Sequence, residues 1–338
     1  MKVLTKAEKA PILKYTGNIR NSILSQKVLK KGFYFVKPQR ISGEAPKDFI
    51  CVYEFGRCLK RRPHNWVHYI AKVGHKWYPL ESITEHLVTR LGQVWGFQMA
   101  NSKLYVISSQ IRFCSEYFLK SDQELVHGAD ILSSYLQEVD SHMIEQIDKN
   151  GWSQELLTFQ FVFSAIQSVF PDESKSMVEG LIKLLLFDAI VGNNDRHFFN
   201  WGVIRNLKNQ HLPTFSPIYD SARALFWNES EDSIVSLTKD SNKMETFLEK
   251  YSNSSKPKIG WEGQKKVNHF QLIEKIASVD EYNKILRKSF SSKVLLQSAT
   301  EVLFSEFERL IGIERRQVII KSLEFRLNTI QKLLNKQS

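Results

Sequence analysis

A polar segment, Gly192-Asn193-Asn194-Asp195-Arg196-His197-Phe198-Phe199-Asn200, directly follows an apolar run over residues 181–191, and Pro217-Ile218-Tyr219-Asp220 comes further along. Glycine readily adopts the left-handed conformation that ends helices, so the chain predicts a helix over residues 173–190 that stops at Gly192. A surface turn rich in Asn and Asp is the simpler interpretation. The clustering of Asn, Asp, Arg and His directly after a buried helix instead favours a loop that carries chemistry.

The residue types in these two segments suit phosphoryl transfer from a nucleotide, in which a protein mainly positions a hydroxyl and stabilises charge. The carboxylate of Asp195 would orient the hydroxyl and accept its proton. The side-chain carbonyl of Asn200 would bind Mg²⁺, and Asp220 would bridge the cation to the phosphates. We expect His197 and Asn193 to support the loop structurally.

The pattern Asn193-x-Asp195-x-His197-x-x-Asn200, followed by Pro217-x-Tyr219-Asp220, resembles the catalytic core of HipA-family serine/threonine kinases, most closely over residues 181–228. The Asp-Arg-His-x-x-Asn portion is also similar to the loop of phosphatidylinositol kinases. Those lipid kinases carry the second metal-binding Asp in an Asp-Phe-Gly-like strand, whereas this chain has Tyr219-Asp220-Ser221, which favours HipA.

The resemblance implies an α+β, bilobal protein-kinase-like fold. A small N-lobe built on a mixed sheet would span residues 1–120, and a mainly helical C-lobe would span residues 121–338. ATP and Mg²⁺ would be the cofactors, and a serine or threonine hydroxyl of a protein would be the phosphate acceptor.

The first third of the chain is rich in aromatic and β-branched residues, which predict strands over residues 32–37, 49–55, 66–73, 103–108 and 111–119. A helix is predicted over residues 83–94 from apolar residues at helical spacing. In the resemblance, Lys72 at the end of the third strand would reach the nucleotide phosphates, and Glu85 of the helix would hold it. Thr84 stands where the family has Asn. A solvated lysine and a helix-terminal glutamate are the alternative.

Two further segments are assigned to ATP by resemblance. Residues 40–47 resemble the Gly-x-x-x-Lys loop of the family, so Ser42 and Gly43 would cover the phosphates, although an ordinary hairpin turn fits equally well. The strand over residues 111–119 resembles the one that joins the lobes, and Glu116 and Phe118 fall where the family contacts adenine through its backbone.

Beyond residue 125 the apolar spacing becomes helical, with helices predicted over residues 129–147, 154–169 and 313–334. Asp188 is interpreted as a satisfied helix residue, His269 as incidental, and residues 252–258 as a flexible loop. Arg196 would pair with an acid or bind a phosphate, and Arg223 would contact phosphate or substrate. The last helix is expected to expose its basic residues to solvent, with a docking face as the alternative: Arg315, Arg316, Lys321, Arg326 and Lys332.

The composition limits which ligands, cysteine-based sites and cellular locations suit the chain. The chain has 338 residues and a formal net charge of +11, which favours acidic ligands and suggests nucleic acid only weakly. Three cysteines without a Cys-x-x-Cys pair argue against a disulfide framework or zinc site and favour a reducing, cytoplasmic location. The N-terminus lacks the apolar core of a signal peptide, and no segment is long and apolar enough to span a membrane.

If the family properties carry over, the protein would be the toxin of a toxin–antitoxin system that acts on a translation component, with a small antitoxin as partner. We expect the chain to lack the additional N-terminal segment of long HipA proteins, which a companion subunit would supply. Three alternatives stay open: a pseudokinase or nucleotide-binding interaction module, a phosphoinositide-type lipid kinase, and a nucleic-acid-binding protein whose affinity depends steeply on salt.

Overall fold

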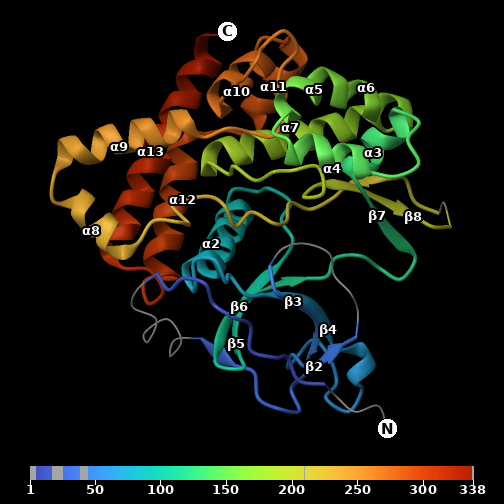
Figure 1. Cartoon of the computed structure of the whole chain (residues 1–338), viewed down its shortest axis with the longest axis vertical. Helices are drawn as coiled ribbons and strands as arrows, with labels where there is room; N and C mark the ends of the chain where they lie inside the picture. The colour runs from blue at the N-terminus through green and yellow to red at the C-terminus, as the bar shows by residue number, and fades with distance from the viewer. Residues whose placement is uncertain (1–4, 17–25, 39–44, 209, 337–338) are drawn as a thin grey trace.

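The computed structural model describes residues 5–16, 26–38, 45–208 and 210–336. Strands dominate the first part of the chain and helices the remainder, and Figure 1 shows the curved sheet below the helices. This arrangement is the predicted α+β, two-lobed architecture. The boundary expected near residue 120 stays a prediction.

The N-lobe is a six-stranded sheet in which neighbouring strands pair antiparallel, except for a parallel pair at one edge. All five strands expected from the sequence are present, with ends shifted by a few residues. In spatial order the strands are β1 (Lys27–Val28), β5 (Ser102–Ile107), β6 (Gln110–Glu116), β4 (Val67–Lys72), β3 (Lys47–Val52) and β2 (Tyr34–Lys37).

The register of this sheet decides which side chains share a face. Lys72 of β4 lies opposite both Lys47 of β3 and Phe113 of β6, and Tyr69 lies opposite Glu116. Because side chains alternate between the faces of a strand, Lys72 and Tyr69 point to opposite sides of the sheet. We call the side of Lys72 the inner face and that of Tyr69 the outer face.

Helix α2 (Leu80–Val94) links the sheet to the helices (Figure 1). Ile83, Leu87 and Leu91 repeat at helical spacing and are buried, and the helix packs against β5, β6 and α12 (Ser292–Ser305). The prediction of a helix over residues 83–94 is confirmed. Its second turn supplies Glu85 to the inner face.

Two of the predicted long helices are each divided. Residues 129–147 form α3 (Gly128–Tyr135) and α4 (His142–Lys149), separated near Gln137, whose φ of 59° is incompatible with a continuing helix. Residues 154–169 form α5 (Ser153–Leu156) and α6 (Phe159–Val169). Thr158 accepts a hydrogen bond from the Phe161 amide, so it starts a new helix as an N-cap.

The centre of the C-lobe is α7 (Ser174–Val191), which is buried along most of its length as its apolar sequence predicts. It ends at Gly192, whose φ of 71° is left-handed and whose amide donates to the Asp188 carbonyl. The surrounding helices are α8 (Glu231–Thr238), α9 (Ser241–Ser254), α10 (His269–Ala277), α11 (Asp280–Lys288), α12 and α13 (Ile313–Lys336).

Helix α13 corrects one prediction. Arg315, Arg316 and Arg326 were expected on a solvated face but are buried. The guanidinium of Arg315 pairs with Glu231 at 2.7 Å, and that of Arg326 donates to the Ala189 carbonyl at 2.7 Å. These long side chains bind carbonyl and carboxylate oxygens of neighbouring segments, a role that helical periodicity does not distinguish from exposure.

A small sheet completes the C-lobe beside the polar segment. Its strands β7 (Gln123–His127), β8 (Gly202–Asn206) and β9 (Thr214–Phe215) pair antiparallel, and β8 begins two residues after Asn200. Ile218 then forms a parallel bridge with Met99 of the segment between α2 and β5. Residues from both lobes therefore meet two positions before Asp220.

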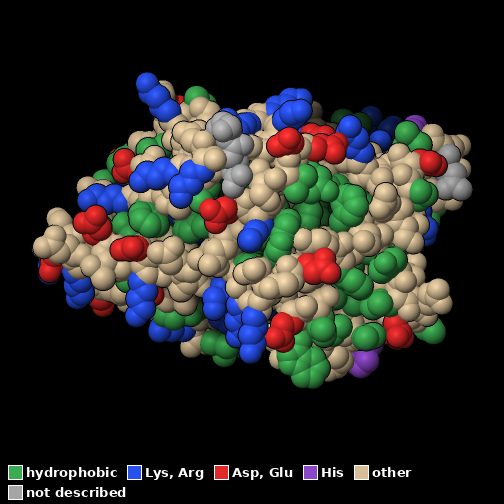
Figure 2. Space-filling model, turned by 90° about the horizontal axis from the view of Figure 1, so that it is seen from above, with side chains coloured by type: hydrophobic (Ala, Val, Ile, Leu, Met, Phe, Trp, Pro, Cys, Tyr) green, Lys and Arg blue, Asp and Glu red, His purple; other side chains and the backbone are tan. Residues whose placement is uncertain are grey.

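Surface charge is mixed over the face formed by the helices: Lys and Arg side chains are interspersed with Asp and Glu (Figure 2). Among the helices of the described ranges, none combines the length and the apolar character that a membrane crossing requires.

Candidate active site

The polar segment after α7 forms a compact loop held by its own side chains. The side-chain amide of Asn193 donates from Nδ2 to Asp188 Oδ1 at 3.0 Å, and the backbone amide of Asp195 donates to Asn193 Oδ1 at 3.3 Å. Asn200 Nδ2 donates to the Asp195 carbonyl at 3.0 Å. These bonds span both ends of the loop, so the positions of Asp195 and Asn200 depend on each other.

Arg196 ties this loop to the segment that carries Asp220. Its guanidinium pairs with Asp188 at 2.8 and 2.9 Å, and both side chains are buried. It also donates to the Asn200 carbonyl at 2.9 Å, to the Tyr219 carbonyl, and to Ser221 Oγ at 2.7 Å. Of the two roles expected for Arg196, the structure shows the acid pair, and Asp188 is satisfied as predicted.

Asp220, Lys72 and Glu85 converge on the inner face between the lobes. Lys72 Nζ lies 2.9 Å from Asp220 Oδ1 and 3.0 Å from Glu85 Oε1. Asp220 has a φ of 54°, a left-handed conformation that is uncommon outside glycine and asparagine. The structure thus brings together residues of a strand, a helix and a segment more than 130 residues further along the chain, where Asp220 follows β9 outside any strand.

Electrostatics distinguish the two carboxylates. Burial disfavours ionisation of Asp220, but the charge of Lys72 outweighs it and holds the Asp220 pKa below its ordinary value. Burial raises the pKa of Glu85, which lies within the field of Asp220 as well as that of Lys72. Burial alone would lower the Lys72 pKa, yet the two carboxylates raise it. Asp220 is therefore ionised beside a charged lysine.

Asp195 lies nearby in a partly buried position. Burial raises its pKa, while the Arg223 guanidinium, whose Nε is 3.2 Å from Asp195 Oδ2, opposes that shift. A carboxylate with a raised pKa accepts a proton more readily, as general base chemistry requires. Arg223 contacts Asp195 here, and a contact with substrate stays a prediction.

His197 contacts Phe199 within the loop, and its supporting role stays a prediction. Its Nδ1 accepts a hydrogen bond from the Phe199 amide at 3.3 Å, and its ring lies edge-on to the Phe199 ring. Burial lowers the His197 pKa and so favours the neutral ring that this bond requires.

The structure places some, but not all, of the residues that the sequence assigned to nucleotide binding. Ser42 and Gly43 lie outside the described residues. The side chain of Glu116 is on the outer face, opposite to Lys72, so a nucleotide contact there would use its backbone, as the sequence analysis expected. The Phe118 ring lies 5.8 Å from that of Tyr219, next to Asp220.

Lys47 was not singled out from the sequence, although it is the lysine of the Gly-x-x-x-Lys pattern. It lies opposite Lys72 in the sheet. Burial and the charge of Lys72 lower its pKa, while Asp220 and Glu85 oppose this shift. The structure therefore adds a second lysine to the cluster, and the pattern itself was the signal that could have found it.

Two expectations about the support of the loop were wrong. His269 is buried and donates from Nε2 to the Asn193 carbonyl at 3.0 Å, and burial lowers its pKa to about 3. Residues 252–258 are not a simple flexible loop, because α9 extends to Ser254 and Ser255 Oγ donates to Asn194 Oδ1 at 2.7 Å. Both contacts join segments distant in sequence, which local composition does not reveal.

The side chains fit a Mg²⁺ ion bound to a nucleotide. Because Asn200 uses its N–H group on the Asp195 carbonyl, its oxygen is the atom that is able to bind a cation. Asp220 supplies an ionised carboxylate, and Mg²⁺ prefers such oxygen ligands, completed by phosphate and water. Within the described ranges, no group of three or more His, Cys, Asp and Glu gathers into a metal centre of its own.

Comparison with known proteins identifies a family and a similar fold. Residues 40–294 match the HipA-like C-terminal domain. The kinase CtkA of Helicobacter pylori, described as proinflammatory, has a similar structure, with a TM-score of 0.69 and 14% identity, over 90% of this chain and 95% of that one. A HipA–HipB–operator DNA complex of Shewanella oneidensis matches with a TM-score of 0.46 and 14% identity, over 99% of this chain and 75% of that one.

A search of curated proteins gave no match. The matched residues cover most of the chain and include Lys72, the loop from Gly192 to Asn200, and Asp220. The protein therefore belongs to the family of the HipA-like C-terminal domain.

Proposed function

We propose that the protein is an ATP-dependent kinase that phosphorylates a serine or threonine hydroxyl of a protein. The observation that carries the proposal is the convergence of Lys72, Glu85 and Asp220 beside the Asp195 loop, in a chain of the HipA family. Phosphoryl transfer needs positioned cations and a carboxylate near the acceptor more than it needs covalent chemistry by the protein.

Each residue has a distinct part in this reaction. Asp195 orients the acceptor hydroxyl and takes its proton as the new O–P bond forms and the bond to the ADP oxygen breaks. Lys72, held by Glu85, binds the nucleotide phosphates. Asn200 and Asp220 would hold Mg²⁺, which would supply positive charge next to the transferred phosphoryl group. Glu116 and Phe118 would contact the adenine base from the connection between the lobes.

The identity of the acceptor protein and a toxin role with an antitoxin partner stay predictions from the family resemblance. A lipid kinase would use the same residues on a different acceptor. Identification of the acceptor therefore distinguishes these functions, and the cleft geometry serves both.

The test is incubation of the purified protein with Mg²⁺ and γ-labelled ATP, with and without cell lysate, followed by mapping of labelled peptides. We expect transfer by the wild type and loss of transfer in Asp195→Asn and Asp220→Asn. Glu124→Gln is the control, because it makes the same acid-to-amide change in an exposed pair with Arg205 that joins β7 and β8, away from the residues assigned to the reaction. This control should keep its activity.

The chemical nature of the labelled acceptor and the binding of Mg-ATP distinguish the proposed protein kinase from a lipid kinase and from a nucleotide-binding module. Label on lipid but not on protein hydroxyls would establish a lipid kinase. Binding of Mg-ATP in a thermal shift experiment without transfer to any acceptor would favour a nucleotide-binding module. If Asp195→Asn transferred phosphate as fast as the wild type, the assignment of the base would be wrong.

A further inference from the structure

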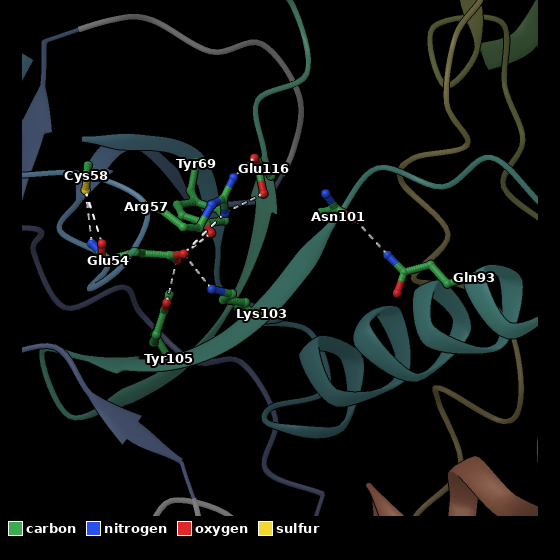
Figure 3. A network of polar contacts seen from close by, with 9 residues as sticks. All are labelled: Glu54, Arg57, Cys58, Tyr69, Gln93, Asn101, Lys103, Tyr105 and Glu116. Carbon is green, nitrogen blue, oxygen red and sulfur yellow. Dashed lines mark hydrogen bonds and ion pairs between the residues drawn. The ribbon is translucent and has the colours of Figure 1, made fainter. Parts of the chain in front are cut away.

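A buried carboxylate lies at the centre of a polar network on the outer face of the N-lobe (Figure 3). Glu54 is only 5% exposed and accepts hydrogen bonds from Tyr69 at 2.6 Å, Tyr105 at 2.9 Å and Lys103 at 2.7 Å. Burial would raise the pKa of Glu54, but these bonds outweigh it and lower the pKa to about 2. A carboxylate that is ionised at neutral pH is thus held against two strands, β4 and β5.

Arg57 connects this group to the end of β6. It lies in the turn after β3, where its amide donates to the Glu54 carbonyl at 3.1 Å and its Nη1 reaches Glu54 Oε2 at 3.2 Å. Both terminal nitrogens also bind the carboxylate of Glu116, at 3.1 and 2.6 Å. A bidentate pair that belongs to a network is the exception among surface ion pairs, which otherwise contribute little.

Glu116 is the last residue of β6, and residues 117–122 then connect β6 to β7. We call residues 116–122 the joint between the lobes. The Glu116 amide donates to the Asn101 carbonyl at 2.7 Å, and the Asn101 side chain accepts from Gln93 of α2 at 3.1 Å. In Figure 3 the network around Glu54 lies on one side of β5 and the Gln93–Asn101 contact lies toward α2.

The joint is also linked to the segment of the candidate metal residue. The amide of Ala100, next to Asn101, donates to the Ile218 carbonyl at 3.0 Å, and the Ile218 amide donates to the Gln98 carbonyl at 2.7 Å. Ile218 precedes Asp220 by two residues. The position of Glu116 is therefore linked through backbone bonds to the segment that presents Asp220.

A cavity of about 670 Å³ opens beside the joint and is lined by Arg57, Lys103 and Glu116 together with residues of α2 and β5. Open space lies along this side of Glu116, whose side chain the Arg57 guanidinium binds. The backbone at the end of β6 is also held by bonds from the Glu116 amide to the Asn101 carbonyl and from the Tyr117 amide to the His68 carbonyl, so we expect loss of Arg57 to loosen this end rather than to release it.

We propose that Glu54 and Arg57 are positioning residues that lock the joint at Glu116 and thereby set the affinity of the cleft between the lobes for a nucleotide. The proposal rests on the nucleotide binding proposed above. Neither residue touches the nucleotide, since both lie on the outer face, opposite to Lys72. They act by holding the backbone from which the adenine contacts would come.

The experiment measures Mg-ATP affinity by calorimetry and steady-state kinetics for Arg57→Gln, Glu116→Gln and the double variant. We expect each single change to weaken binding about two- to fivefold, which corresponds to an exposed ion pair that contributes up to about 1 kcal/mol. The double variant should be no weaker than either single one, because the same contact is lost. Arg57→Lys should recover part of the affinity.

Steady-state kinetics distinguish a positioning role from a structural one. The value of kcat should stay within about twofold while KM rises, whereas a merely structural loss would lower the active fraction and leave KM unchanged.

A matched control is Arg205→Gln, which breaks the exposed pair with Glu124 between β7 and β8, at 2.6 Å. Hydrogen exchange without nucleotide tests whether Arg57 holds the backbone at Glu116, which we call the lock. Arg57→Gln should speed exchange at the amides of Glu116 and Tyr117, and Arg205→Gln should not.

The outcomes separate this proposal from the proposed function. If Arg57→Gln binds Mg-ATP with the affinity of the wild type, the proposal is overturned. A wild type that fails to bind Mg-ATP, while exchange responds as expected, refutes the proposed function and leaves the lock supported. Unchanged exchange refutes the lock.

Discussion

Replacement of Asp188 by Asn is the change whose effect follows most directly from the structure. Asp188 and Arg196 are both almost fully buried, and each Asp188 oxygen accepts one guanidinium bond, at 2.8 and 2.9 Å. Asp188 Oδ1 also accepts from the amide of Asn193. An asparagine at this position would turn an N–H group toward one of these donors and leave the guanidinium without a counter-charge.

The magnitude follows from the cost of breaking a buried pair, which is about 3–5 kcal/mol because an uncompensated charge is left behind. For a lobe of this size, 1 kcal/mol corresponds to roughly 2–4 °C in Tm, so we expect a decrease of roughly 6–20 °C. The loss should also lower activity, since Arg196 binds the carbonyls of Asn200 and Tyr219.

The assay is thermal unfolding followed by circular dichroism, with and without Mg-ATP. Glu124→Gln is the matched control, because it makes the same acid-to-amide change in the exposed pair with Arg205, where we expect a loss of at most about 1 kcal/mol. If Asp188→Asn unfolds at the same temperature as this control, the pair does not hold the loop and the reasoning fails.

Three further predictions concern backbone strain and pH. Gly192→Ala should cost about 1–2 kcal/mol in unfolding free energy for its left-handed φ, and more than Gly263→Ala, because only at Gly192 would the new Cβ meet a guanidinium, that of Arg326 at 3.2 Å. Denaturant titrations should rank the two accordingly. Because a base must be deprotonated, kcat/KM should fall with decreasing pH at a value above the ordinary aspartate pKa of 3.8, and Arg223→Met should move this limb of the pH–rate profile upward. The lowered Glu54 pKa implies stability that is complete above its ordinary pKa of 4.5 and is lost as pH falls toward about 2, so Glu54→Gln should flatten acid unfolding in that window. An equally steep acid transition in Glu54→Gln would contradict this assignment.

The sequence predicted those parts of the fold that depend on local pattern. The strands of the N-lobe, the helix that carries Glu85 and the end of α7 at Gly192 all followed from alternation, helical spacing and a glycine stop. Helix breaks were missed where a single residue governs the backbone, as at Gln137 with its positive φ and at Thr158 with its capping hydroxyl.

Contacts between distant segments could not be predicted from the sequence. His269 and Arg326 looked like ordinary helix residues, yet both bind backbone carbonyls of the loop or of the helix that leads to it. The pairing of Lys72 with Glu85 came from the family resemblance rather than from periodicity, and the contact of Lys72 with Asp220 was not predicted. Glu54, Arg57 and Glu116 lie in a turn and at the end of a strand. The spacing of apolar residues does not indicate which charged side chains pair at such positions.

The turn that holds Arg57 also contains Cys58, whose Sγ lies 3.3 Å from the Glu54 amide and 3.4 Å from the Glu54 carbonyl. The other two cysteines, Cys51 and Cys114, are buried, and burial raises the pKa of both thiols, which keeps them unreactive. A thiol-directed fluorophore should therefore attach at Cys58 first. The natural sequence thus offers one reporter position next to the joint between the lobes, where the emission of a bound dye can follow opening and closing of the cleft without an engineered cysteine.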